Sequence, residues 1–299
     1  MRRIFHILLL FVLAPLLVSC GPSDERVFHG YLYFVQGPYL MRFSLRDDSV
    51  AMATHLGNRT VREISPFGEN RLLLSETASV NRRNVARISW LDLKTGQSEA
   101  LYSGVRARFV AAAGTIVYDD GGTVYAVPLA GDSGVDTIIM SHERNRLSAM
   151  VTAADGQLLF EAAEAGRPAI YLYRAASGEL AKLEELGAFC RLEGAVWIDE
   201  LNGLMCRQRA DESEGAGHDY VIADASGRLI SRPLLPEGGP FLALAYIPDQ
   251  GVVVFRESRE SLLGGQREYA LWAHDVGSGE NHLLSKGQNL GTSVVYTAY

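Results

Sequence analysis

The 299-residue sequence predicts an all-β protein, a six-bladed β-propeller closed by its C-terminal strand, on three observations. One unit of short strands and turns recurs along the chain. Its period lies in the forties, and the two ends of the chain carry strand fragments that complete one another. Repeats of this length built from about four short strands are typical of propeller blades.

The repeat is clearest at residues 152–183. Asp155-Gly156 predicts a turn, residues 157–160 a strand, residues 169–173 a second strand, and Ser177-Gly178 a second turn. Apolar strands bounded by such turn residues indicate antiparallel hairpins.

Six copies of this unit account for nearly all of the chain after residue 28. In five of them the same place is held by Leu72, Ile116, Leu158, Leu204 and Val252, which are 44, 42, 46 and 48 residues apart. The first strand of each copy is expected at 31–35, 71–74, 115–118, 157–160, 203–206 and 251–255. The second strand is expected at 40–45, 88–93, 123–129, 169–173, 220–225 and 269–275.

The two ends of the chain give an independent indication of a closed ring. Residues 291–299 read as a strand that has no partner strand following it in the chain. Residues 29–33 read as a strand that lacks the innermost strand expected before it. Pairing the two completes the first blade and removes the exposed edges that a propeller must hide. A β-sandwich would give no reason for matched fragments, and five or seven blades are the alternative counts.

The first nineteen residues predict an export signal. Arg2 and Arg3 precede an apolar run that is shorter than the roughly 20 residues of a membrane span, which is the layout of a secretory signal. The run ends in Leu17-Val18-Ser19-Cys20, which resembles the bacterial lipobox, whose cysteine is acylated and becomes the new N-terminus. The alternative is an ordinary signal peptide that happens to contain a cysteine.

The resemblance divides the chain into a lipoprotein signal peptide at 1–19, lipidated Cys20 with a short tether at 20–28, and the propeller at 29–299. Several acyl chains on one residue would anchor the protein stably to a membrane. By analogy with lipoprotein sorting in enteric bacteria, Gly21 favours the outer membrane. We therefore expect a protein of the cell envelope that faces the periplasm.

Charge argues against nucleic acid as a partner. The net charge of the whole chain is −7, and it is −9 once residues 1–19, with two arginines and no acid, are removed. Nucleic-acid binding requires a clustered basic surface, so we expect no such partner.

Spacing leaves the state of Cys190 and Cys206 open and slightly favours two free thiols. An oxidising compartment permits a disulfide. However, a hairpin that turns near Asn202 would place Cys206 opposite about residue 195, which is too far from Cys190 for a bridge. Cys206 also takes the place that phenylalanine holds in two other copies, which predicts a core position.

The repeat resembles that of TolB-type propellers. That family's unit has a Ser-Pro-Asp-Gly turn, an apolar strand, an Ile-Tyr strand and a Thr/Ser-Gly turn. In this sequence residues 154–160 read ADGQLLF, 170–173 read IYLY and 177–180 read SGEL, and partial copies occur at 65–68 (SPFG) and 247–251 (IPDQG). The resemblance implies the propeller fold. The chain departs from TolB in having a lipid anchor and no N-terminal α/β domain, and no binding residue can be carried over.

Arginines near the start of the innermost strand in four copies predict a binding site at the mouth of the central channel. Arginine binds carboxylate or phosphate bidentately, which would suit an acidic protein segment or an anionic glycan. The alternative is surface charge paired with nearby glutamates, namely Glu63, Glu143 and Glu193. The candidate residues are Arg59, Arg62, Arg106, Arg108, Arg144, Arg146, Arg191 and His142.

Three longer polar segments between first and second strands, at 76–87, 208–218 and 256–268, are expected to be loops that either contact a partner or are simply solvated. We predict no catalytic residue, metal site or cofactor, because the six histidines of the propeller are scattered and no nucleophile elbow occurs.

These observations favour a membrane-anchored, non-catalytic propeller that binds an envelope protein partner. The alternative is a binding protein or enzyme that acts at the channel mouth on an anionic glycan or a small ligand.

Overall fold

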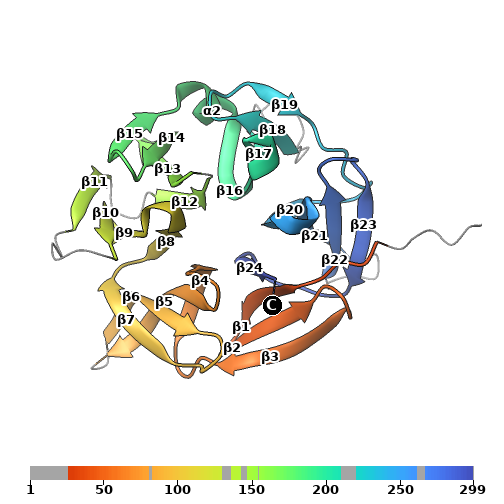
Figure 1. Cartoon of the computed structure of the whole chain (residues 1–299), viewed down its shortest axis with the longest axis horizontal. Coiled ribbons are helices and arrows are strands. Elements are labelled where there is room, and N and C mark those ends of the chain that lie inside the picture. The colour runs from red at the N-terminus through yellow and green to blue at the C-terminus, as the bar shows by residue number, and fades with distance from the viewer. Residues whose placement is uncertain are drawn as a thin grey trace, which may run out of the picture.

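A computed structural model describes residues 26–80, 83–129, 136–142, 147–153, 155–209, 220–260 and 267–298. Six four-stranded antiparallel sheets stand around a central axis, as Figure 1 shows. The chain is therefore a six-bladed β-propeller, as its repeats predict. The predicted signal peptide and Cys20 lie outside the described residues, in which no helix is long and apolar enough to cross a membrane.

Each blade consists of four strands, which we number from the innermost to the outermost. The first and second strands of each sequence repeat are therefore the second and third strands of a blade. The first three blades are β24 (Val294–Thr297), β1 (Tyr31–Gln36), β2 (Tyr39–Ser44) and β3 (Ser49–His55); β4 (Thr60–Pro66), β5 (Arg71–Val80), β6 (Arg83–Asp92) and β7 (Ser98–Ser103); and β8 (Arg106–Val110), β9 (Thr115–Asp119), β10 (Thr123–Pro128) and β11 (Thr137–Ser141). The last three are β12 (Leu147–Thr152), β13 (Gln157–Glu164), β14 (Arg167–Arg174) and β15 (Glu179–Lys182); β16 (Cys190–Ile198), β17 (Gly203–Gln208), β18 (Tyr220–Asp224) and β19 (Leu229–Ser231); and β20 (Phe241–Ile247), β21 (Val252–Glu260), β22 (Arg267–Asp275) and β23 (Asn281–Lys286). Helix α2 (Glu184–Phe189) lies between the fourth and fifth blades, and short 3-10 turns η1 (Ala111–Ala113), η2 (Asp199–Leu201) and η3 (Pro248–Gln250) follow three innermost strands.

The C-terminal strand closes the ring. β24 pairs antiparallel with β1, with Tyr31 opposite Thr297 and Tyr33 opposite Val295. The hydroxyl of Ser293, just before β24, accepts a hydrogen bond from the amide of Ile64 in the second blade at 2.8 Å. The closure predicted from the two chain ends is confirmed.

The repeated apolar positions form the core between the blades. Leu72, Ile116, Leu158, Leu204 and Val252 are all 0% exposed. Burying one such side chain stabilises the fold by about 1.5–3 kcal/mol, so this register contributes to the packing energy of each of these five blades.

Two segments expected as loops are hairpin arms instead. β5 and β6 continue to pair from Glu76 opposite Arg87 as far as Val80 opposite Arg83. β21 and β22 likewise pair as far as Glu260 opposite Arg267. The prediction was wrong because two buried but charged residues, Glu76 and Glu257, interrupt the apolar run of each strand. The tips of the arms, at Ser79 and Arg259, are exposed, so no buried side imposes the alternation of apolar and polar residues that marks a strand. Most of the third segment, 208–218, lies outside the described residues.

The preference for free thiols was also wrong, since Cys190 and Cys206 form a disulfide with their Cα atoms 5.8 Å apart. A regular hairpin would separate them, but β16 contains a wide bulge. Arg191 lies opposite Arg207 and Val196 opposite Met205, so residues 192–195 together oppose Cys206 alone. The bulge brings Cys190 within bonding distance. Both cysteines are fully buried, as the core position of Cys206 predicts.

Alternating strand directions give the propeller two distinct faces. The terminal face carries the turns from innermost to second strands, including η1, η2 and η3, together with the start of β1 and the end of β24. The hairpin face carries the β5–β6 and β21–β22 hairpins and the loops that lead into each innermost strand. The start of β1 and the end of β24 therefore lie on the face opposite the long hairpins.

Candidate functional site

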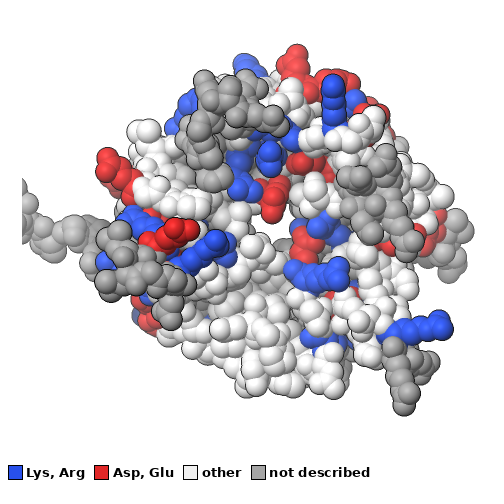
Figure 2. Space-filling view, turned by 180° about the vertical axis from the view of Figure 1, so that it is seen from behind, with Lys and Arg blue, Asp and Glu red and all other residues white. Residues whose placement is uncertain are grey.

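The channel mouth on the hairpin face is the candidate site. Residues from all six innermost strands or the loops that lead into them line a central cavity of about 550 Å³. Figure 2 shows this face, with charged side chains of both signs gathered round the central opening. The volume falls within the range of roughly 300–1,000 Å³ that is usual for ligand pockets.

Glu63 joins two of the predicted arginines at this opening. Its carboxylate accepts a hydrogen bond from Arg106 Nε at 2.9 Å and pairs with Arg108, both from the next blade. Arg106 also donates to the carbonyl of Leu147, in the fourth blade, at 2.8 Å. Burial alone would raise the pKa of Glu63, but the two guanidinium groups outweigh it and hold that pKa below its usual value. The three side chains therefore form a fixed, ionised cluster that links three blades.

The predicted residues divide into those at the cavity and those away from it. Arg62, Arg106 and Arg108 line the cavity. Arg62 is exposed, and its side chain makes no hydrogen bond or ion pair with any described residue. Arg59 turns away, because its guanidinium donates to Ser98 at 2.9 Å and lies 3.6 Å from Glu76. Arg191 is exposed and is not among the lining residues. Arg144 and Arg146 lie outside the described residues.

His142 is buried at the edge of this site. Its Nε2 lies 3.0 Å from Oδ1 of Asp119, and both side chains are 2% exposed. Asp119 lines the cavity and also accepts a hydrogen bond from the amide of Gly121 at 2.8 Å. The pair thus fixes the tight turn after β9 against the loop that follows β11.

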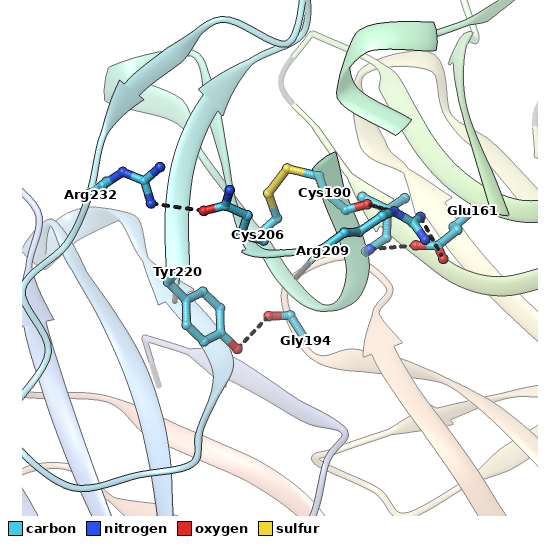
Figure 3. The surroundings of a disulfide bond; sticks show 9 residues. Glu161, Cys190, Gly194, Cys206, Arg209, Tyr220 and Arg232 are labelled. Atoms are coloured by element: carbon cyan, nitrogen blue, oxygen red, sulfur yellow. Dashed lines mark hydrogen bonds and ion pairs between the residues drawn. A yellow bond between two sulfur atoms is a disulfide. The ribbon is translucent and has the colours of Figure 1, made fainter. Parts of the chain in front are cut away.

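The bulge in β16 forms another part of the wall. Glu193, Gly194 and Ala195 line the cavity, and the hydroxyl of Tyr220 donates to the Gly194 carbonyl at 3.2 Å. The same hydroxyl accepts from the amide of Ala243 in the sixth blade at 2.8 Å. Burial raises the pKa of Tyr220 to about 12. Figure 3 shows the Cys190–Cys206 disulfide and the hydrogen bond from Tyr220 to Gly194, so the bulge is held at two points.

Buried carboxylates near the ends of second strands were missed by sequence reasoning. Glu161 Oε2 accepts from the amide of Leu192 at 2.7 Å, which ties the fourth blade to the bulge, and Oε1 lies 3.2 Å from Arg209. Equivalent carboxylates in other blades accept from nearby loops and side chains: Glu76, Asp119 and Glu257. The available signal was an acidic residue three to five positions after the repeated apolar residue in four of the six blades. These groups position the loops that form the mouth.

The tether is fastened on the opposite, terminal face. Arg26 pairs with Asp275, the last residue of β22, and donates to the carbonyl of Gln250, the last residue of η3. The Gln250 side chain in turn bonds the backbone of His29, at 3.2 Å to the amide and 2.8 Å to the carbonyl. The chain thus leaves the propeller on the side away from the channel mouth described above.

No three His, Cys, Asp or Glu side chains within the described ranges are grouped so that they could hold a metal ion. Apart from Arg62, the charged groups described at the mouth are paired with each other, with nearby side chains or with backbone groups. Such an arrangement suits recognition of a ligand by hydrogen bonds and charge.

Comparison with known proteins agrees with the fold. No protein-family model matches the sequence, and a search of curated proteins finds no match. Among solved structures, the chain is similar to TolB from Acinetobacter baumannii (14% identity, TM-score 0.58, 89% of this chain and 65% of that one). It is also similar to a putative TolB from Agrobacterium tumefaciens (14% identity, TM-score 0.56, 90% and 98%) and to a chain of a nidogen/laminin complex (11% identity, TM-score 0.58, 87% and 93%). The chain thus spans just under two thirds of the Acinetobacter TolB. At these identities the likeness establishes the fold.

Proposed function

We propose that this protein is a non-catalytic binding platform of the bacterial cell envelope, anchored by lipid on Cys20, that holds a protein partner on its hairpin face. The observation that carries the proposal is the placement of the tether. Arg26 is fastened to the terminal face, so the hairpins and the channel mouth are on the opposite side.

The length of the tether supports this orientation. Residues 20–25 separate the proposed lipid from Arg26, and six residues span at most about 20 Å when extended. An anchor on so short a tether would hold the terminal face near the membrane. The hairpin face would then be presented to the periplasm.

The disulfide supports export. Disulfides persist in oxidising compartments such as the periplasm and are rare in the cytosol. The buried Cys190–Cys206 bond fits a protein that folds after crossing the inner membrane.

The chemistry of the mouth supports binding over catalysis. A general acid or base works best with a pKa near the working pH. Glu63 is shifted the other way by Arg106 and Arg108, and so stays ionised. Two solved TolB structures share the fold, and we take their likeness as support for a binding role in the envelope.

A second candidate function rests on the cavity itself. Its volume of about 550 Å³ and the three arginines that line it would suit an anionic glycan or a small anionic ligand, bound or turned over at the channel mouth. In that case the hairpins would be dispensable.

The test is crosslinking in the native host, followed by affinity capture of the full-length lipidated protein. A C-terminal tag is suitable because that end lies on the terminal face. Two variants separate the functions: one shortens the β5–β6 arm by replacing residues 79–84 with Asn-Gly, and the other is Arg108→Gln. We expect a stoichiometric envelope partner that is lost on shortening the arm and kept in the arginine variant. Capture of the protein alone, with a glycan bound only when Arg108 is intact, would overturn the platform in favour of the second candidate.

A further inference from the structure

The first blade carries a second cleft on the hairpin face, to one side of the channel. It has a volume of about 600 Å³. Three segments form it: the β1–β2 turn around Gly37, the loop around Gly57 that leads into β4, and the loop around Gly291 that leads into β24. The cleft therefore lies where the ring is closed.

The neighbouring blades give this cleft raised walls. In the first blade only Gly37 and Pro38 separate β1 from β2, whereas in the second blade β5 and β6 pair as far as Val80 and Arg83. In the sixth blade β21 and β22 pair as far as Glu260. Since the first blade stands between these two, its short turn leaves a notch between two projecting hairpins. In Figure 2 the lower part of the face, where the first blade lies, is mostly free of charged side chains.

The floor of the cleft is open backbone. Gly37, Gly57 and Gly291 have φ of 58°, 69° and 73°, and no heavy atom lies within 4 Å of the position a Cβ would take on any of them. Glycine at such positions lets another backbone approach closely. Val35, Val61 and Pro38 add apolar surface, so an extended polypeptide would fit better here than a compact polar molecule.

Charge complementarity specifies the sign of the occupant. None of the lining residues is Asp or Glu, although the protein as a whole carries a net charge of −7. Arg62 lines both this cleft and the central cavity, and within the described ranges it has no ion-pair partner. Arg59 is already held by Glu76 and Ser98, and Glu63 is held by arginines of the next blade. Arg62 is thus the one lining arginine of the cleft whose charge no described side chain offsets.

We propose that this cleft binds an extended segment of the partner protein, with a carboxylate of that segment on Arg62. The inference rests on the proposed function and names the site and the chemistry of the bound segment. The segment would lie between the two hairpins over the glycines, with an acidic side chain or C-terminus at the inner end. The hairpins would contact the flanks of the partner.

The test places a photo-crosslinking benzoylphenylalanine at one of three exposed positions in the full-length protein in its native host. Asn58 reports on the cleft, Ser148 on the central cavity, and Asn84 on the β5–β6 hairpin. We expect Asn58 to crosslink to a protein segment that contains Asp, Glu or a C-terminal carboxylate, identified by mass spectrometry. Arg62→Gln should lower that yield roughly tenfold, the loss expected for one charge-assisted hydrogen bond. The matched control Arg167→Gln, an exposed arginine at the edge of the fourth blade, should not.

The outcomes separate the two proposals. Crosslinks at Asn84 or Ser148 with none at Asn58 would overturn the cleft and leave the platform standing. A glycan or lipid at Asn58, or a protein segment without an acid, would overturn the chemistry assigned to Arg62. Silence at all three positions would overturn the platform and the cleft together.

Discussion

The disulfide gives a prediction that tests the structure against the simplest interpretation of the sequence. The Cys190–Cys206 bond closes a loop with a sequence separation of 16. In the chain-entropy model, a crosslink over about 15 residues removes denatured-state freedom worth about 3 kcal/mol. For a domain of this size, 1 kcal/mol corresponds to roughly 2–4 °C in Tm, so reduction should lower Tm by about 6–12 °C.

The measurement is thermal unfolding with and without a phosphine reductant, in a Cys20→Ser background so that no other cysteine is present. The matched control is the double variant Cys190→Ala/Cys206→Ala, whose Tm should be the same under both conditions. That variant should unfold slightly below the reduced wild type, because two fully buried sulfur atoms are removed without replacement.

A thiol count gives the decisive check. The denatured, unreduced protein should react with no thiol reagent, and with two equivalents after reduction. Two reactive thiols before reduction, together with a Tm that does not respond to reductant, would refute the bond. The bulge in β16 would then lack the covalent link that we assign to its base.

Four further predictions follow from other contacts. Cys20→Ser should move the protein from the membrane to the soluble fraction, and unchanged fractionation would contradict lipidation. Tyr220→Phe should lower the free energy of unfolding, measured with denaturant, by about 2–4 kcal/mol, because two backbone groups in neighbouring blades lose their shared partner. A loss below about 0.5 kcal/mol would contradict the hydrogen bonds that Tyr220 makes to Gly194 and Ala243. Burial alone would raise the pKa of Asp275, but hydrogen bonds from Ser278 and Arg26 outweigh it and lower that pKa to about 2. The stability that this shift contributes is present above the ordinary pKa of 3.8 and is lost as pH falls towards 2. Asp275→Asn should therefore reduce the fall in the free energy of unfolding between about pH 4 and pH 2. An unchanged fall would contradict the contacts of Asp275 with Arg26 and Ser278. Deleting residues 294–299 should open the ring and expose the edge of β1, which would appear as aggregation in size-exclusion chromatography, whereas a monomeric, fully folded product would contradict closure by β24.

The fold could be predicted because each blade repeats one physical requirement. Leu72, Leu158 and Leu204 recur because the second strand of every blade is buried on both sides by its neighbours. Turn residues at fixed distances from these positions set the register. The closing strand was also visible, because a ring without exposed edges requires the two ends to pair.

The disulfide could not be predicted because it depends on a bulge. Gly194, with φ of 67°, is the one sign of a bulge in residues 192–195, but a glycine does not tell how many residues oppose Cys206. Counting along a regular hairpin therefore gives the wrong partner. The projecting hairpins were missed for a related reason. Glu76 is buried but charged, so it ends the apolar pattern of β5, and the polar residues that follow read as a loop.

The placement of three of the predicted arginines could be inferred from the sequence, but their pairing could not. Arginines at the start of innermost strands do lie at the mouth, as Arg62, Arg106 and Arg108 show. Their partners come from other blades, so Glu63 binds the arginines of the third blade and not its own neighbour Arg62. Sequence spacing within one repeat carries no information about such contacts.

Strand parity explains why the tether and the proposed binding surface lie on opposite faces. The described chain contains 24 antiparallel strands, an even number, and begins with the second strand of the first blade. The last strand must therefore end on the face from which the first one starts, so both termini share the terminal face. Hairpins between second and third strands always turn on the other face. Lengthening one of these hairpins, as in β5–β6 and β21–β22, extends the hairpin face without disturbing the closure or the tether. A short turn left between two such hairpins then creates a walled cleft over the first blade, and this is the surface on which we place the partner.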